Sequence, residues 1–150
     1  MNEANIPNPA LKEFTILVGR WKTIGTHPYV PNVTFHGQST FEWIEGGAFL
    51  VMRSEMDEPE IPSGIAIFGS DDADSRYFIS YFDERGVSRQ YECSMNGNEL
   101  KWWRESDEFS QRFTITIAED GASMRGGGEM SKDGGPWEQD LQLTYTRVET

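Results

Sequence analysis

The sequence predicts an all-β protein, a single antiparallel up-and-down β-barrel of about ten strands with one short N-terminal helix closing the barrel. Three observations support this prediction. Apolar and polar residues alternate with a period of two through most of the chain after Gly19. Short clusters of Gly, Asn and Asp, such as Asn96-Gly97-Asn98, separate the alternating segments. No helix-sized gap lies between these segments, which favours a meander, and closing the meander into a barrel removes its two bare edges.

The length fits one domain over residues 1–150, large enough to bury roughly two thirds of the surface of the unfolded chain. We expect a short tail over 1–7, a helix over about 9–18 and strands over about 20–148. No repeat, linker or second domain is visible in the sequence.

The helix is predicted from its ends and from one apolar stripe. Asn8 can cap it, and Pro9 suits its first position, where the missing N–H group costs nothing. Gly19 is expected to end it. The stripe recurs at three- and four-residue spacing and consists of Leu11, Phe14, Leu17 and Val18.

The alternating segments are rich in β-branched and aromatic residues, which favour strands. We expect strands over 20–26, 33–44, 48–56, 64–69, 76–82, 87–95, 99–104, 111–118, 123–130 and 137–148. Two longer connections, 27–32 and 57–63, contain prolines and are expected at the rim of the barrel.

The last predicted strand indicates which of its faces points inward. Its more apolar face carries Trp137, Gln139, Leu141, Leu143, Tyr145 and Arg147. Its other face carries Glu138, Asp140, Gln142, Thr144 and Thr146. We therefore expect the first set to face the interior and the second set to face solvent.

Three consecutive strands do not alternate, because residues 49–52, 65–68 and 77–82 are apolar on both faces. In a meander these strands are neighbours, so their outer sides would form one apolar patch. Such a patch on a soluble protein usually marks an interface. The sequence therefore predicts a homodimer in which the patch packs against its copy.

Composition argues against several classes of partner. The chain has 13 basic and 25 acidic residues, a formal net charge of −12. A field of that sign disfavours nucleic acid and membrane surfaces as partners. Cys93 is the single cysteine, which agrees with a reducing cytoplasm. The N-terminus has neither the basic start nor the apolar run of a signal peptide, so none is expected.

Two features carry a resemblance to a known superfamily. Gly19-Arg20-Trp21 opens the first strand directly after the helix, and Arg147 lies near the end of the last strand. This pattern resembles the calycins, which include the lipocalins and the fatty-acid-binding proteins. The resemblance implies that Gly19, Trp21 and Arg147 are structural, with the basic side chain over the indole at the closed end. A guanidinium on an indole face is worth about 1–2 kcal/mol when partly buried.

The opening Leu17-Val18-Gly19-Arg20-Trp21 is similar to that of short bacterial calycins of unassigned function. Nitrobindin, a ten-stranded haem-binding calycin, shares the helix and the Gly-x-Trp start. It holds haem through a histidine late in the chain, whereas this sequence has none after His36. His27 and His36 also lack the partners and spacing of a zinc site. We therefore expect no cofactor and no metal.

A ten-strand barrel is wider than side chains usually fill, so an internal cavity is expected. The predicted ligand is a small apolar or amphipathic molecule. The candidate ligand-binding residues are Arg53, Tyr81, Arg89, Tyr91, Trp102 and Tyr145. An inward arginine among Arg53, Arg89 and Arg104 could bind a carboxylate, as the resemblance to fatty-acid-binding proteins implies. The alternative is that these arginines reach solvent at strand ends and pair with carboxylates.

Two other functions remain open from the sequence. An isomerase or cyclase could use the same cavity, with Glu55, Tyr81 or Tyr145 as an acid or base beside an arginine. An interaction module could use the outer patch while side chains fill the barrel. Cys93 is expected to be a buried thiol without a catalytic role, so no catalytic residue is predicted.

Overall fold

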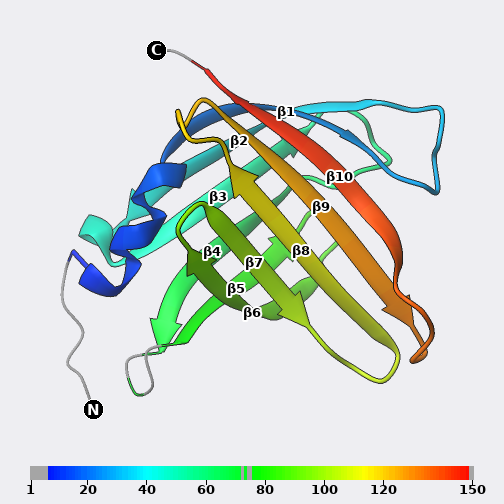
Figure 1. Ribbon diagram of the computed structural model, residues 1–150. Helices are drawn as coiled ribbons and strands as arrows, with labels where there is room; N and C mark the ends of the chain where they lie inside the picture. The colour runs from blue at the N-terminus through cyan, green and yellow to red at the C-terminus, as the bar shows by residue number, and fades with distance from the viewer. Residues whose placement is uncertain (1–6, 72, 74–75, 149–150) are drawn as a thin grey trace.

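The computed structural model describes residues 7–71, 73 and 76–148. Ten antiparallel strands form one closed barrel in which each strand pairs with its neighbours in sequence and β10 returns to pair with β1 (Figure 1). The strands are β1 (Gly19–Thr26), β2 (Phe35–Ile44), β3 (Phe49–Met56), β4 (Gly64–Asp71), β5 (Arg76–Asp83), β6 (Ser88–Asn96), β7 (Glu99–Arg104), β8 (Phe109–Ile117), β9 (Ser123–Lys132) and β10 (Glu138–Arg147). The predicted barrel is confirmed.

The helix η1 (Pro9–Leu17) begins as predicted, since Asn8 accepts a hydrogen bond from the N–H of Ala10 and Pro9 occupies the first turn. It is a 3-10 helix, in which side chains three residues apart lie above one another. Its buried residues keep that spacing: Leu11, Phe14 and Leu17. A second, three-residue 3-10 turn, η2 (Glu45–Gly47), joins β2 to β3.

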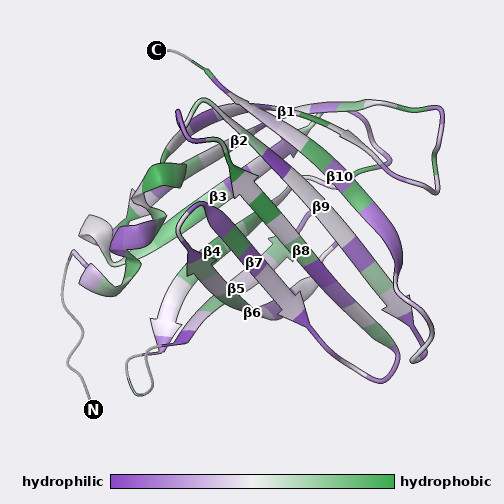
Figure 2. Ribbon diagram, viewed as in Figure 1, coloured by the Kyte–Doolittle hydropathy of each residue, from purple (hydrophilic) through white to green (hydrophobic). Residues whose placement is uncertain are grey.

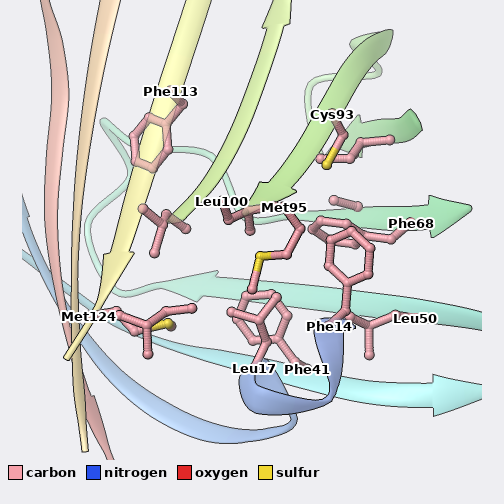
Figure 3. Packing of buried hydrophobic residues seen from close by; sticks show 14 of the residues in the cluster. Phe14, Leu17, Phe41, Leu50, Phe68, Cys93, Met95, Leu100, Phe113 and Met124 are labelled. Atoms are coloured by element: carbon pink, nitrogen blue, oxygen red, sulfur yellow. The ribbon is translucent and has the colours of Figure 1, made fainter. Parts of the chain in front are cut away.

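The helix η1 covers one end of the barrel, and the β1–β2 connection lies at the opposite end (Figure 1). At the covered end Phe14 packs against Phe68, with ring centroids 5.6 Å apart, and Leu17 lies near Phe41 and Met95 (Figure 3). Hydrophilic and hydrophobic residues alternate along the strands (Figure 2). Packed side chains therefore fill the end of the barrel that η1 covers. The opposite end, at the β1–β2 connection, is the mouth of the barrel.

Trp21 and Arg147 join the two ends of the chain at the closed end. They are Cα partners across β1 and β10, and the guanidinium carbon lies 4.1 Å from the indole centroid. Trp21 is fully buried, and its Nε1–H donates to the carbonyl of Leu17. Gly19 has a φ of 137°, and a Cβ there would lie 2.5 Å from Nη1 of Arg147. Glycine thus makes room for the guanidinium.

The inward assignment of β10 is correct over its second half and wrong at its start. A β-bulge shifts the register of β9 and β10 between Gln139 and Gln142. Gln139 is exposed, as is Trp137 just before the strand, where the guanidinium of Arg112 lies 3.9 Å from the indole centroid. Asp140, which was expected to face solvent, instead lines the barrel interior. An extra residue in a bulge changes which side chains point inward.

The glycines of β9 accommodate an aromatic ring. A Cβ on Gly126 would lie 2.7 Å from two ring atoms of Phe113, and one on Gly128 would lie 2.9 Å from a third. Phe113 in turn stacks on Trp102, with ring centroids 4.7 Å apart and an interplanar angle of 16°. The glycine run therefore allows a close backbone approach, which is what glycine in a strand interior often indicates.

The outer sides of β3, β4 and β5 carry a group of apolar residues, interrupted by Arg53 and Ser80, which we call the outer patch. Cα pairing places Val51 beside Ile67 and Ile65 beside Phe82. Phe49 and Phe82 are about 40% exposed, at 41% and 40%. The members of the outer patch are Phe49, Ile65, Ile67, Phe78 and Phe82, which surround the outward but buried Val51, 2% exposed.

Candidate functional site

The barrel contains a cavity of about 520 Å³. The two connections expected at the rim, 27–32 and 57–63, both contribute to its lining, through His27, Tyr29 and Ile61 among others. The wall below them is mostly apolar. It includes Met52, Ala66, Phe68, Ile79, Trp102, Phe113 and Leu143. The interior is therefore hollow over part of its length.

A chain of hydrogen bonds crosses the mouth of the cavity. His27 Nε2 lies 2.7 Å from Asp140 Oδ1, and Gln111 Nε2 donates to Asp140 Oδ2 over 3.3 Å. Gln111 Oε1 accepts from Arg89 Nη1 at 3.0 Å and from the Tyr91 hydroxyl at 2.9 Å. These side chains come from the β1–β2 connection and from β10, β8 and β6. We call them the mouth network.

The contacts determine which groups donate and which accept in the mouth network. The backbone N–H of Tyr29 donates to His27 Nδ1 over 3.1 Å, so the ring donates from Nε2 to Asp140. Every bond then points towards Asp140, whose side chain is 17% exposed. Arg89 retains further N–H groups, and the Tyr91 oxygen retains acceptor capacity. The network can therefore both donate to and accept from a molecule in the cavity.

The bulge and the loop explain why the sequence did not reveal this network. Asp140 reaches the interior only because of the bulge, and Gln111 lies in phase with Phe113 but carries no chemical signature of its own. His27 reaches Asp140 across 113 residues of sequence. Alternation alone predicts neither contact, although Gln111 could have been found as a polar residue on an inward face.

Three inward tyrosines keep their protons. Burial is the main cause that raises the pKa of Tyr81, Tyr91 and Tyr145 above the ordinary tyrosine value. Tyr81 also donates to Asp83 Oδ2 over 2.8 Å. Asp83 has its pKa lowered to about 2, chiefly by its hydrogen bonds with Arg85. These phenols are hydrogen-bonding groups rather than bases near neutral pH.

The candidate ligand-binding residues fall into two groups. Five of them line the cavity: Tyr81, Arg89, Tyr91, Trp102 and Tyr145. Arg53 does not, because its parity on β3 is that of the outer patch. Its side chain is 51% exposed, and its Nε lies 3.4 Å from Glu42 Oε1. Glu55 shares that outer face and is exposed, so it cannot act on a molecule in the cavity.

Other chemical candidates lie outside the cavity or are inert. His36 faces solvent and contacts Glu58 over 3.0 Å. Burial raises the pKa of the Cys93 thiol to about 12, which makes it a poor nucleophile. Within the described residues, no group of three or more His, Cys, Asp and Glu side chains is arranged to hold a metal ion.

Comparisons with known proteins agree on the fold. Residues 7–147 match the profile of the family described as Protein of unknown function (DUF1579). Rv2717c from M. tuberculosis superposes with a TM-score of 0.69 at 15% identity, covering 97% of this chain and 100% of its own. The S-type phycobiliprotein lyase CPES from Guillardia theta gives 0.57 at 11% identity, with 91% of each chain covered.

The zebrafish ileal bile acid-binding protein, solved with cholic acid, gives a TM-score of 0.54 at 12% identity, covering 89% of this chain and 100% of its own. No curated protein sequence matches this chain. At these identities the similarities concern the fold. They confirm the calycin-like barrel fold that Gly19-Arg20-Trp21 and Arg147 led us to expect.

Proposed function

Because this chain belongs to the DUF1579 family, described as proteins of unknown function, we propose a function from the cavity itself. We propose that the barrel binds a small apolar or amphipathic molecule. The observation that carries this proposal is a cavity of about 520 Å³ with an apolar wall and a polar mouth. Ligand sites commonly combine an apolar lining with a few oriented polar groups.

Two features of the neighbours and of the site support binding. The bile acid-binding protein that shares this fold is complexed with cholic acid. In this chain the mouth network would orient a polar head group, and Trp102 and Phe113 would contact the apolar part. The raised pKa values of the inward tyrosines favour binding over proton abstraction by an isomerase or cyclase. The hollow interior disfavours an interaction module with a filled barrel.

Titration with dodecanoate, retinol and haem, each followed by tryptophan fluorescence, tests this function. We expect at least one probe to change the emission, because Trp102 lines the cavity. In Trp102→Phe most of that change should disappear. Trp103→Phe is the matched control, since Trp103 is the next residue and its Nε1 donates to Glu92 Oε2. If no probe changes either the emission or the melting temperature, the proposed function is wrong.

We also propose that the protein self-associates through the outer patch. The patch lies on one side of the barrel, and two of its three phenylalanines, Phe49 and Phe82, are about 40% exposed. A two-fold axis would let the same surface cover itself in both copies. Arg53 on the outer side of β3, next to the patch, forms an ion pair with Glu42 on β2.

Light scattering after size-exclusion chromatography should therefore give about twice the 17.1 kDa of one chain. Phe82→Glu should convert the dimer into monomers, because a carboxylate would be buried against its own copy. Ile24→Glu, at a site 37% exposed on β1, should leave the dimer intact. A monomer of wild-type protein at micromolar concentration would contradict the proposed dimer.

The longer of the helices in the described part spans nine residues, well short of the ~20 that cross a bilayer.

We propose a cellular location from the single cysteine. Cys93 is buried, so its thiol is shielded from partners. We place the protein in the cytoplasm, where a single unpaired cysteine stays reduced.

A further inference from the structure

Hydroxyl groups from β10, β1, β2 and β3 lie side by side in the barrel wall, and those of Tyr145, Ser39 and Ser54 belong to residues that line the cavity. Tyr145 on β10 and Thr23 on β1 are Cα partners. The Thr23 and Ser39 hydroxyls lie 2.8 Å apart, and Ser39 on β2 is the Cα partner of Ser54 on β3. We call these four residues the hydroxyl belt. Ser39 is also the Cα partner of Trp21, so the belt passes next to the side chain that closes the barrel.

Tyr145 is the unusual member of the hydroxyl belt. It is 2% exposed and lines the cavity, yet no group among the described residues hydrogen-bonds its hydroxyl. Every fully enclosed side-chain nitrogen or oxygen in the described part of the chain has a partner. The Tyr145 hydroxyl must therefore open onto the cavity. Burying a hydroxyl without a partner is costly, so this group is suited to meet one from a bound molecule.

The charge around the belt limits which group that partner can be. The cationic residues of the cavity lining come from the mouth end: Arg85, Arg89, Arg112 and Lys132. Arg147, although close in sequence, directs its guanidinium nitrogens to the backbone carbonyls of Gly121, Val18 and Ile16. No lining cation is therefore available at the floor to offset the burial of a charge.

We infer that the cavity binds an apolar molecule that carries an uncharged hydroxyl or carbonyl oxygen at its buried end, hydrogen-bonded to Tyr145. This inference rests on the proposed binding function. It adds that the ligand carries a second polar group, at the end opposite its head group. A ligand of this class has a head group at the mouth network and an oxygen at the hydroxyl belt. A plain alkyl chain would leave the Tyr145 hydroxyl without a partner.

Fatty acids of 10 to 16 carbons, compared with their ω-hydroxylated forms, test the inference. The carboxylate should stay at the cationic mouth, which directs the ω end to the floor. At the best-fitting length we expect the ω-hydroxy acid to bind wild-type protein about fivefold to tenfold more tightly, as one net hydrogen bond provides. Tyr145→Phe should abolish this preference while leaving the affinity for the plain acid nearly unchanged.

A second measurement needs no ligand. Because the Tyr145 hydroxyl has no hydrogen-bond partner among the described residues, Tyr145→Phe should leave the melting temperature unchanged or raise it. Tyr77→Phe is the matched control for binding, since the Tyr77 hydroxyl donates to Glu13 Oε2 on η1 rather than facing the cavity. It should retain the preference for the ω-hydroxy acid.

Three outcomes overturn the inference: equal binding of both acids at every length, a preference that survives in Tyr145→Phe, or a clear loss of stability in that variant. These outcomes leave the proposed function intact as long as the plain acids bind. If neither series binds wild-type protein while other probes do, the inference fails alone. If no probe of any class binds, the proposed function fails as well.

Discussion

Replacing Arg147 by Met should lower the free energy of unfolding by about 3 kcal/mol, since hydrogen bonds from a charged group contribute about 1.5–3 kcal/mol each before solvent screening. Three guanidinium nitrogens donate to backbone carbonyls at 2.8–2.9 Å, and the group lies 4.1 Å from the Trp21 ring. Met keeps much of the apolar stem but leaves the three carbonyls without these donors. Urea unfolding followed by circular dichroism measures the loss.

Arg125→Met provides the matched control for this prediction. Arg125 is exposed on the outside of β9, so its replacement should change stability by no more than about 0.5 kcal/mol. Arg147→Lys should fall between the two, because an ammonium keeps the charge but cannot reach three divergent carbonyls at once. Equal losses in Arg147→Met and Arg125→Met would contradict a specific role for Arg147.

Gly126→Ala should destabilise the barrel by about 2–3 kcal/mol, as overpacking of a tight core does. The sign is informative, because Gly→Ala at a compatible site stabilises by about 0.4–1 kcal/mol through the unfolded chain. Here the new Cβ would lie 2.7 Å from two atoms of the Phe113 ring, which is itself stacked on Trp102. The ring must move, and the Trp102 contact must change with it. Thermal and urea unfolding measure the effect.

The neighbouring glycine supplies the control. A Cβ on Gly127 would approach Oε1 of Gln142 at 2.9 Å, the far end of a flexible side chain that can rotate away. Gly127→Ala should therefore be nearly neutral. Combining Gly126→Ala with Phe113→Leu should cost less than the sum of the two single changes, since the smaller side chain relieves the clash. Additive losses would show that the ring is not the cause.

Alternation predicted the barrel well because the inward face of a regular strand follows a period of two. Tyr91 and Leu143 illustrate this, since each faces the interior with its predicted neighbours. The same rule placed Asp140 outside, because one extra residue in a bulge reverses the parity and leaves no mark in composition. The sequence also leaves open which side of 49–52 faces out. All four of these residues are apolar, so alternation cannot distinguish the inner side from the outer side.

The candidate site was less predictable than the fold. Arg53 follows Phe49 and Val51 in phase and Arg89 precedes Tyr91 in phase, yet only Arg89 lines the cavity. The difference depends on which side of each strand faces the centre, a property of the closed barrel rather than of either segment. Whether the Tyr145 hydroxyl finds a hydrogen-bond partner depends on side chains from other strands of the barrel. The local sequence around Tyr145 does not contain that information.

The pairing of β1 with β10 also bears on how the chain reaches its fold. The bond from Arg147 to the carbonyl of Val18 joins residues 129 positions apart, almost the whole length of the chain. Contacts of such long range are entropically costly to form and slow folding. During synthesis the edge of β1 waits unpaired until the last strand has emerged, so the nascent sheet is exposed to wrong partners for nearly the entire period of translation.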